Sequence, residues 1–399
     1  MKKLVVLVAG LLSVALFAQA EETQNTKENT FSMKVQIRPR AEYRNGVLFP
    51  RPKDAESTGF INNRARLSLG YERDRLSIGL SAQHVGVWGQ DLQIDKNGRF
   101  ILNEAWAKLD FGSGFFAKLG RQSLVYDDER IMGALDWNVA GRYHDALKLG
   151  YENTNNQLHL ILAFNQNDEK TIGGTYYAPG AQPYKTMQTL WYKHLFDKSF
   201  NASFLFMNLG MEGGDAEKQN SDTKYLQTLG TNLIYTPSHW TVGGTFYYQF
   251  GKTKSGRDVS AFLWAVNAAY QIDPQWKIGV GSDYLSGSDG ADGKYKAFDP
   301  LYGTHHKFYG AMDYFYASSF VNGLNPGLWD NQVNVAYKPS SKVNLSLAYH
   351  YFSITGDVYE GNDKLSKGLG SELDFQVDWV IMKDVKLSAD ILRCWERIP

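Results

Sequence analysis

The chain has 399 residues, and its 42 basic and 42 acidic residues give a formal net charge of +0. No overall field therefore favours nucleic acid or anionic lipid as a partner, and any electrostatic function requires local segregation of charge. The 14% aromatic content, with 38 glycines and 24 tyrosines, is typical of many strands, tight turns and interfacial aromatic girdles, and it argues against a helical enzyme.

The first twenty residues have the pattern of a secretory signal peptide. A basic start is followed by an apolar run from Leu4 to Phe17 and by the small-residue cleavage site Ala18-Gln19-Ala20. A short membrane anchor is the alternative, but the run is shorter than the roughly 20 residues that a spanning helix needs. Residues 21–30 are predicted to be a disordered polar tail, and one barrel domain is predicted over 31–399.

The first strand, predicted at 31–44, alternates polar and apolar residues. One parity holds Lys34, Gln36, Arg38, Arg40, Glu42 and Arg44. The other parity is apolar, with Val35, Ile37 and Tyr43 among its members. Because successive strand residues point to opposite faces, one face requires water and the other requires an apolar medium. A transmembrane β-barrel supplies both, with lipid outside and an aqueous lumen inside.

Similar patterns predict further strands along the chain. The complete set is 31–44, 61–72, 75–88, 100–111, 115–125, 141–152, 156–166, 186–196, 199–208, 224–235, 239–250, 257–272, 276–286, 328–338, 342–354, 370–382 and 384–395. Short turns rich in Asn, Asp, Pro, Gly and Ser alternate with longer loops. This alternation is typical of outer-membrane barrels, which have short periplasmic turns and long extracellular loops. A soluble β-sandwich is the alternative.

The strand count is odd, whereas bacterial single-chain barrels have an even number of strands. One explanation is that the sequence is truncated, or read out of frame near its end, so that a closing strand is missing. The other is an additional strand around Lys307–Tyr316. The predicted fold class is therefore an all-β, transmembrane antiparallel barrel of the 18-stranded type, of which about 17 strands are readable.

Basic residues at lumen-facing positions are the main candidates for a binding site. The candidate substrate contacts are Arg38, Arg40, Arg64, Arg66, Lys118, Arg121, Arg142 and Lys148. Arginine stays charged, and its planar fork of donors matches carboxylates. A ring of bases lowers the electrostatic barrier for an anion and raises it for a cation. The alternative is that these bases brace the wall by pairing with acids such as Glu42 and Glu104.

Other motifs carry weaker signals. The aromatic-rich loop at 287–327 is predicted to form either a constriction inside the lumen or an ordered external cap. Asp127-Asp128-Glu129 is interpreted as a solvated acidic loop in preference to a calcium site, and His305-His306 lacks a companion set of metal ligands. No phosphate loop, zinc signature or nucleophile elbow is present in the sequence. We therefore predict no enzyme activity, no cofactor and no metal.

Several short motifs, in order over nearly the whole mature chain, carry a family resemblance. They are Asn63-Arg64-Ala65-Arg66-Leu67, Gln83 to Gly89, Glu104-Ala105-Trp106, Lys118-Leu119-Gly120-Arg121-Gln122, Tyr126-Asp127-Asp128, Gly141-Arg142, Asp145-Ala146-Leu147, Phe298-Asp299-Pro300, His306-Lys307-Phe308-Tyr309-Gly310 and Glu372-Leu373-Asp374. With these motifs the chain resembles the alginate-export family of bacterial outer-membrane barrels. The resemblance implies an 18-stranded monomeric barrel whose Arg- and Lys-lined lumen passes a polyuronate outward. The C-terminus departs from the family pattern, because no closing strand is predicted there.

The predicted function is a passive outer-membrane channel for an alginate-like anionic polysaccharide or oligosaccharide. A general or small-anion porin is the first alternative, and a barrel hydrolase is the second. The expected partners are the polysaccharide, outer-membrane lipid and periplasmic export machinery, with no nucleic acid.

Overall fold

The structure is a computed structural model that describes residues 29–45, 54–93, 100–169, 176–177, 183–215, 217–218, 220–288, 293–318 and 325–396. Its long strands are β1 (Thr30–Arg44), β2 (Thr58–Arg73), β3 (Leu76–Val87), β4 (Phe100–Gly112), β5 (Phe115–Gln122), β6 (His144–Glu152), β7 (Asn156–Phe164), β8 (Thr186–Leu195), β9 (Phe200–Glu212), β10 (Thr223–Tyr235), β11 (Trp240–Lys252), β12 (Asp258–Gln271), β13 (Trp276–Leu285), β14 (Leu328–Ser340), β15 (Val343–Ser353), β18 (Gly368–Met382) and β19 (Val385–Glu396). The short elements are the hairpin strands β16 (Tyr359–Glu360) and β17 (Asp363–Lys364), the 3-10 helix η1 (His305–Lys307) and the helix α2 (Tyr314–Ser318). No helix in the described ranges is long and apolar enough to cross a bilayer.

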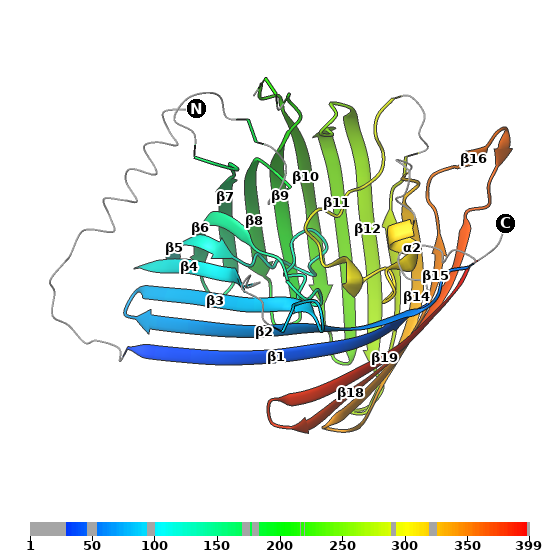
Figure 1. Ribbon diagram of the computed structural model, residues 1–399, viewed down its shortest axis with the longest axis horizontal. Coiled ribbons are helices and arrows are strands. Elements are labelled where there is room, and N and C mark those ends of the chain that lie inside the picture. The colour runs from blue at the N-terminus through cyan, green and yellow to red at the C-terminus, as the bar shows by residue number, and fades with distance from the viewer. Residues whose placement is uncertain are drawn as a thin grey trace.

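The seventeen long strands form one antiparallel sheet in which each strand pairs with its neighbours along the chain, β15 being joined to β18. Figure 1 shows this sheet curled round like the wall of a barrel. Each predicted strand is confirmed, with boundaries that differ by a few residues. The predicted signal peptide and most of the predicted tail lie outside the described residues, and β1 begins at Thr30.

The outer face of the sheet is apolar and exposed, as the alternation in the first strand predicts. On β1, Val35 is 61% exposed, Ile37 is 66% exposed and Tyr43 is 77% exposed, whereas the inward Arg64 of the neighbouring β2 is fully buried. A water-soluble protein would bury the first set and expose the second. Exposed apolar residues combined with buried charge indicate a wall with acyl chains outside and a polar interior.

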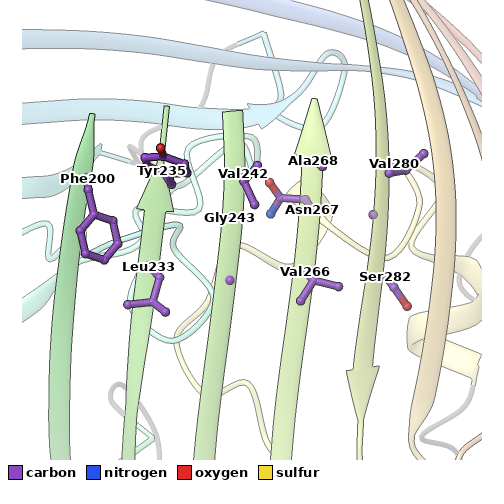
Figure 2. Close-up of a pocket in the computed structure, with 12 residues that line it drawn as sticks. Phe200, Leu233, Tyr235, Val242, Gly243, Val266, Asn267, Ala268, Val280 and Ser282 are labelled. Atoms are coloured by element: carbon purple, nitrogen blue, oxygen red, sulfur yellow. The ribbon is translucent and has the colours of Figure 1, made fainter. Parts of the chain in front are cut away.

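A groove on this outer face lies across β9 to β13 and has a volume of about 790 Å³. Figure 2 shows the apolar side chains that line it, including Leu233, Val242, Val266 and Val280. These residues share the outward parity of their strands and are 39–54% exposed. The groove therefore faces lipid, and the functional site has to be sought on the other side of the wall.

The two ends of the sheet run in the same direction, because sixteen antiparallel steps separate β1 from β19. Among the described residues, no backbone ladder joins these two strands. The alternative of a further strand around Lys307–Tyr316 is wrong, because that segment holds η1 and α2. The expectation that the sequence is cut short at its end stays a prediction.

Two long loops fold into the interior. The first, residues 123–143, follows β5; it shortens the strands predicted at 115–125 and 141–152, which end at Gln122 and begin at His144. The second, described at 293–318, carries η1 and α2. Its α2 residue Phe315 stacks on the inward ring of Phe352 at 4.6 Å between centroids. Of the two readings of this loop, the constriction inside the lumen is therefore confirmed and the external cap is wrong.

The two interior loops also bind each other. Met132 and Tyr302 form a parallel bridge, and the amide of Gly133 donates to the carbonyl of Tyr302 at 2.9 Å. The amide of Thr304 donates to the carbonyl of Glu129 at 2.9 Å. These backbone bonds join segments about 170 residues apart in sequence, so the loops act as one plug-like unit inside the wall, which we call the inner plug (residues 123–143 and 293–318).

Candidate functional site

Four arginines from β1 and β2 converge on the tip of the first interior loop. Arg38 and Arg64 are direct cross-strand partners, and like charges at such positions destabilise a sheet unless they are neutralised. The carboxylate of Asp136 supplies that neutralisation: it lies 2.9 Å from Arg64, 3.4 Å from Arg66 and 3.7 Å from Arg38. These predicted site residues are therefore brought together, but around an internal carboxylate.

The remaining donors of this arginine cluster hold the backbone of the same tip. Arg38 donates to the carbonyl of Asp136 at 2.6 Å, and Arg40 donates to that of Trp137 at 2.8 Å. Arg40 also pairs with Glu42 at 2.7 Å, which is a bracing contact of the kind that the alternative reading described. The ring of Trp137 lies under the Arg40 guanidinium at 4.2 Å and stacks on His306 at 3.6 Å between centroids. The cluster thus anchors the inner plug to β1 and β2.

A row of three lysines crosses the next strands in register. Lys108 of β4 is opposite Lys118 of β5, which in turn is opposite Lys148 of β6. In the described part of the chain, none of the three ammonium groups forms an ion pair; Lys108 lies over the ring of Phe116 at 4.2 Å and Lys118 over that of Trp106 at 3.7 Å. We call this set the lysine row. Within the described residues, no carboxylate neutralises the positive charge of this row.

The two other predicted bases are engaged. Arg121 shares the parity of the exposed Leu119, opposite to that of Lys118, so the expectation that it faces the lumen is wrong. It forms a bidentate pair with Asp145, with nitrogen–oxygen distances of 2.9 and 3.0 Å. Arg142 is largely buried and donates to the carbonyl of Gly303 at 2.9 Å, so it ties the first interior loop to the second. Burial lowers the pKa of Arg142 from its ordinary value. Both residues stabilise the wall or the plug.

An acidic wall stands on β13, β14 and β18, and sequence reasoning did not recognise it as part of the site. Its inward carboxylates are Asp283, Asp330, Glu372 and Asp374. His350 of β15 bridges Asp330 at 2.9 Å and Asp374 at 3.7 Å. The alternating acids of 372–378 could have revealed one half of this wall, but nothing in the sequence indicates that it forms a surface separate from the basic strands.

The acidic wall holds the second interior loop as the arginines hold the first. The amide of Met312 donates to Glu372 at 2.7 Å, and that of Ala311 donates to Asp374 at 3.0 Å. Bases thus gather on β1 to β6 and acids on β13 to β18. The net charge of zero conceals this segregation.

The acidic triplet that opens the first loop is also engaged, which corrects the reading of a solvated loop. Asp127 accepts from the indole of Trp191 at 3.0 Å, and Asp128 pairs with Arg130 at 2.8 Å. Glu129 pairs with Lys307 at 3.2 Å. Burial raises the pKa of Asp127 from its ordinary value. Within the described residues, no group of three or more His, Cys, Asp or Glu side chains is arranged to hold a metal ion.

The second interior loop should loosen on acidification because it buries His305. Burial lowers the pKa of His305 to about 4, and the positive charge of Arg142 adds to the effect. A released loop would take up a proton below about pH 6.5, so its packing is fully stable above that value and weakens as the pH falls towards 4. Amide exchange itself slows as the pH falls, so the measurement is the protection factor, which is the intrinsic exchange rate divided by the observed rate. Protection factors in residues 293–318 should be lower at pH 5 than at pH 7.5. The change His305→Gln should flatten this dependence, and His194→Gln, near the end of β8 and outside the plug, should leave it intact.

A family model described as alginate export matches residues 32–389. The chain belongs to the alginate export family. This assignment and the all-β fold make the chain a bacterial outer-membrane β-barrel of the channel type. No curated protein matches the chain.

Solved porins share the fold of this alginate export family member. OccAB4 from Acinetobacter baumannii is 12% identical, with a TM-score of 0.60, covering 92% of this chain and 94% of that one. A BenF-like porin from Pseudomonas fluorescens Pf-5 is also 12% identical, with a TM-score of 0.58 and the same coverage. OpdK from Pseudomonas aeruginosa, solved with vanillate, is 11% identical, with a TM-score of 0.58 and again the same coverage.

Proposed function

We propose that this chain is an outer-membrane channel for solutes that carry carboxylates, with alginate-like oligosaccharides or polysaccharides as the first candidates. The observation that carries the proposal is the lysine row. Three like charges in register destabilise a sheet, by roughly 0.2–1 kcal/mol for each opposed pair, and no described acid pairs with them. A wall serving stability alone would alternate the signs of these charges.

The mechanism follows from the arrangement of the charges. A carboxylate entering the interior exchanges part of its hydration for the ammonium groups of the lysine row. Several weak contacts in sequence let a solute enter and leave, which is the condition for conduction. The inner plug sets how much room remains between the two walls.

Recordings from the purified protein in planar bilayers test this proposal. The reversal potential in a salt gradient should show preference for anions, and oligomers of mannuronate should block the current at low salt. The block should weaken as salt rises, because exposed charges are screened. A channel that prefers cations, or whose chloride current is unaffected by uronate oligomers at low salt, contradicts the proposal.

A channel for small organic anions is the second candidate, and the inner plug favours it. Two loops joined to each other and to both walls occupy the interior, which suits a small solute better than a polymer. One structural neighbour, OpdK, was solved with vanillate, a small aromatic carboxylate. Blocking by mannuronate oligomers of increasing length separates the two candidates: a polymer channel should bind longer oligomers more tightly, and a small-anion channel should not.

The carboxylate at the plug tip should limit anion preference, because it neutralises part of the arginine cluster. In Asp136→Asn, Arg38 and Arg40 keep their bonds to backbone carbonyls and Arg66 keeps its bond to Gln83, but the local charge rises by one unit. We expect the ratio of anion to cation permeability to increase by a few-fold, as judged by the reversal potential. Asp145→Asn, which removes a carboxylate from Arg121 outside the cluster, is the matched control. A lower ratio in Asp136→Asn would contradict the expectation.

A further inference from the structure

A second hollow lies on the inner wall, close to the short turns and away from the arginine cluster. Its volume is about 360 Å³, within the range of small-molecule sites. Its lining residues are Ser123, Val125, Tyr126 and Asp127 of the first loop, Lys148 of β6, Gln157 and His159 of β7, Trp191 and Lys193 of β8, and Ile234 of β10. We call it the rim pocket.

One side of the rim pocket is a fixed aromatic surface. The rings of Tyr126 and Trp191 lie 4.9 Å apart, and that of His159 lies 5.1 Å from Trp191. The Tyr126 hydroxyl is 3.0 Å from Nδ1 of His159, whose Nε2 is 2.8 Å from Glu152. The Trp191 indole donates to Asp127 at 3.0 Å. Because these bonds hold each ring, a ligand would meet an apolar surface that needs no reorganisation.

The other side of the pocket offers polar groups without partners among the described residues. Lys148 and Lys193 form no ion pair there, and the buried hydroxyl of Ser123 has no hydrogen-bond partner. A buried polar group left unpaired is costly and calls for an explanation. Asp127 also lines the pocket, where its carboxylate accepts from Trp191, so the two ammonium groups outnumber the acidic groups of the lining by one. Beside the aromatic surface, this set fits a carboxylate attached to a six-membered ring.

We propose that the rim pocket is a binding site for one ring-bearing carboxylate, either a hexuronate residue or an aromatic acid. The ring would lie against Tyr126 and Trp191, the carboxylate would meet Lys148 and Lys193, and Ser123 would bond to a ring substituent. This inference rests on the proposed function and refines it, because it places one binding site for the solute along the channel. It also assigns a role to Lys193, which lies outside the lysine row.

Isothermal titration of the detergent-solubilised full barrel with glucuronate, benzoate and glucose tests the site. We expect glucuronate or benzoate to bind and glucose, which lacks a carboxylate, to bind at least tenfold more weakly. The acid that binds more tightly shows whether the site prefers a sugar ring or an aromatic ring. Lys193→Gln should weaken binding of the preferred acid by about tenfold, and Ser123→Ala should weaken it by a few-fold.

Lys277→Gln is the matched control, because Lys277 lies on the inner face of β13 near the short turns and does not line the pocket. It should leave the affinity unchanged. The inference is overturned if neither acid binds, if glucose binds equally well, or if Lys193→Gln and Lys277→Gln behave alike. Bilayer selectivity of the same preparation separates the two proposals: an anion-selective barrel that binds no ring acid refutes the rim pocket alone, and a barrel without anion preference refutes the proposed function.

Discussion

Replacing Lys118 and Lys148 by glutamate should turn an anion-preferring channel into one that prefers cations. The double change alters the charge of the lysine row by four units on two adjacent strands, where no described carboxylate pairs with either ammonium. One contact between unit charges at 4 Å is worth about 1 kcal/mol in water and about 4 kcal/mol near a protein surface. The ratio of anion to cation permeability should therefore fall by at least about tenfold, and the reversal potential should change sign.

Two controls make this result specific to the row. Lys118→Gln with Lys148→Gln removes charge without reversing it and should give an intermediate potential. Lys198→Glu with Lys254→Glu makes the same change of four units at exposed positions outside the strands and the inner plug and should have little effect. If the row variant folds and its reversal potential equals that of the unchanged protein, the lysines do not determine selectivity.

The strands could be predicted from the sequence because the pattern that forms the barrel wall is contained within each strand. Each strand has to present apolar residues to lipid and polar residues to the interior. The polarity of successive residues therefore alternates in segments such as 31–44. Register follows from the same alternation together with the short turns. Neither of these depends on contacts between residues far apart in sequence, which is why all the long strands were predicted.

The inner plug could not be predicted, because its placement depends on such distant contacts. Asp136 meets Arg38, 98 positions away, and Thr304 meets Glu129, 175 positions away. Leu124 and Val125 continue the apolar pattern of β5, so the prediction carried that strand to residue 125. The backbone leaves the extended region at Asp127, Glu129 and Leu135, whose φ values of 52°, 73° and 49° are positive. Positive φ values are uncommon for residues other than glycine, so these turns could not be predicted from the residue types.

The same limit applies to the candidate site. Alternation assigns seven of the eight predicted bases to the inner face, Arg121 having the opposite parity to Lys118, but it did not distinguish bases with partners from bases without them. Arg64 and Arg121 are paired with carboxylates, whereas Lys118 and Lys148 are not. Lys193 and Trp191 were missed, although the period of two in β8 places both on the inner face. Applying that parity to every strand would have found them, but the rim pocket itself also needs the first interior loop.

Arg130 is the residue whose loss should disturb the inner plug most. It lies in the first loop, is 4% exposed, and pairs with Asp128 at 2.8 Å and with Asp283 of β13 at 2.7 Å. Its guanidinium also lies over the ring of Phe308 in the second loop at 3.8 Å. Arg130→Met would leave Asp283 buried without its cation, and breaking a buried pair in this way costs about 3–5 kcal/mol. Both loops should therefore detach from β13 while the strands stay paired.

Hydrogen exchange and conductance together measure this detachment. Amide exchange in residues 123–143 should accelerate by at least about a hundredfold, given 1.4 kcal/mol for each factor of ten, while exchange in β9 to β12 should change little. Single-channel conductance should rise as the plug loosens. Arg130→Met with Asp283→Leu removes both charges and should recover much of the protection, because a buried pair replaced by apolar groups is often tolerated. If the single variant keeps both the exchange rates and the conductance of the unchanged protein, the plug is held by its backbone bonds and its contacts to the arginine cluster, and the pair with β13 is dispensable.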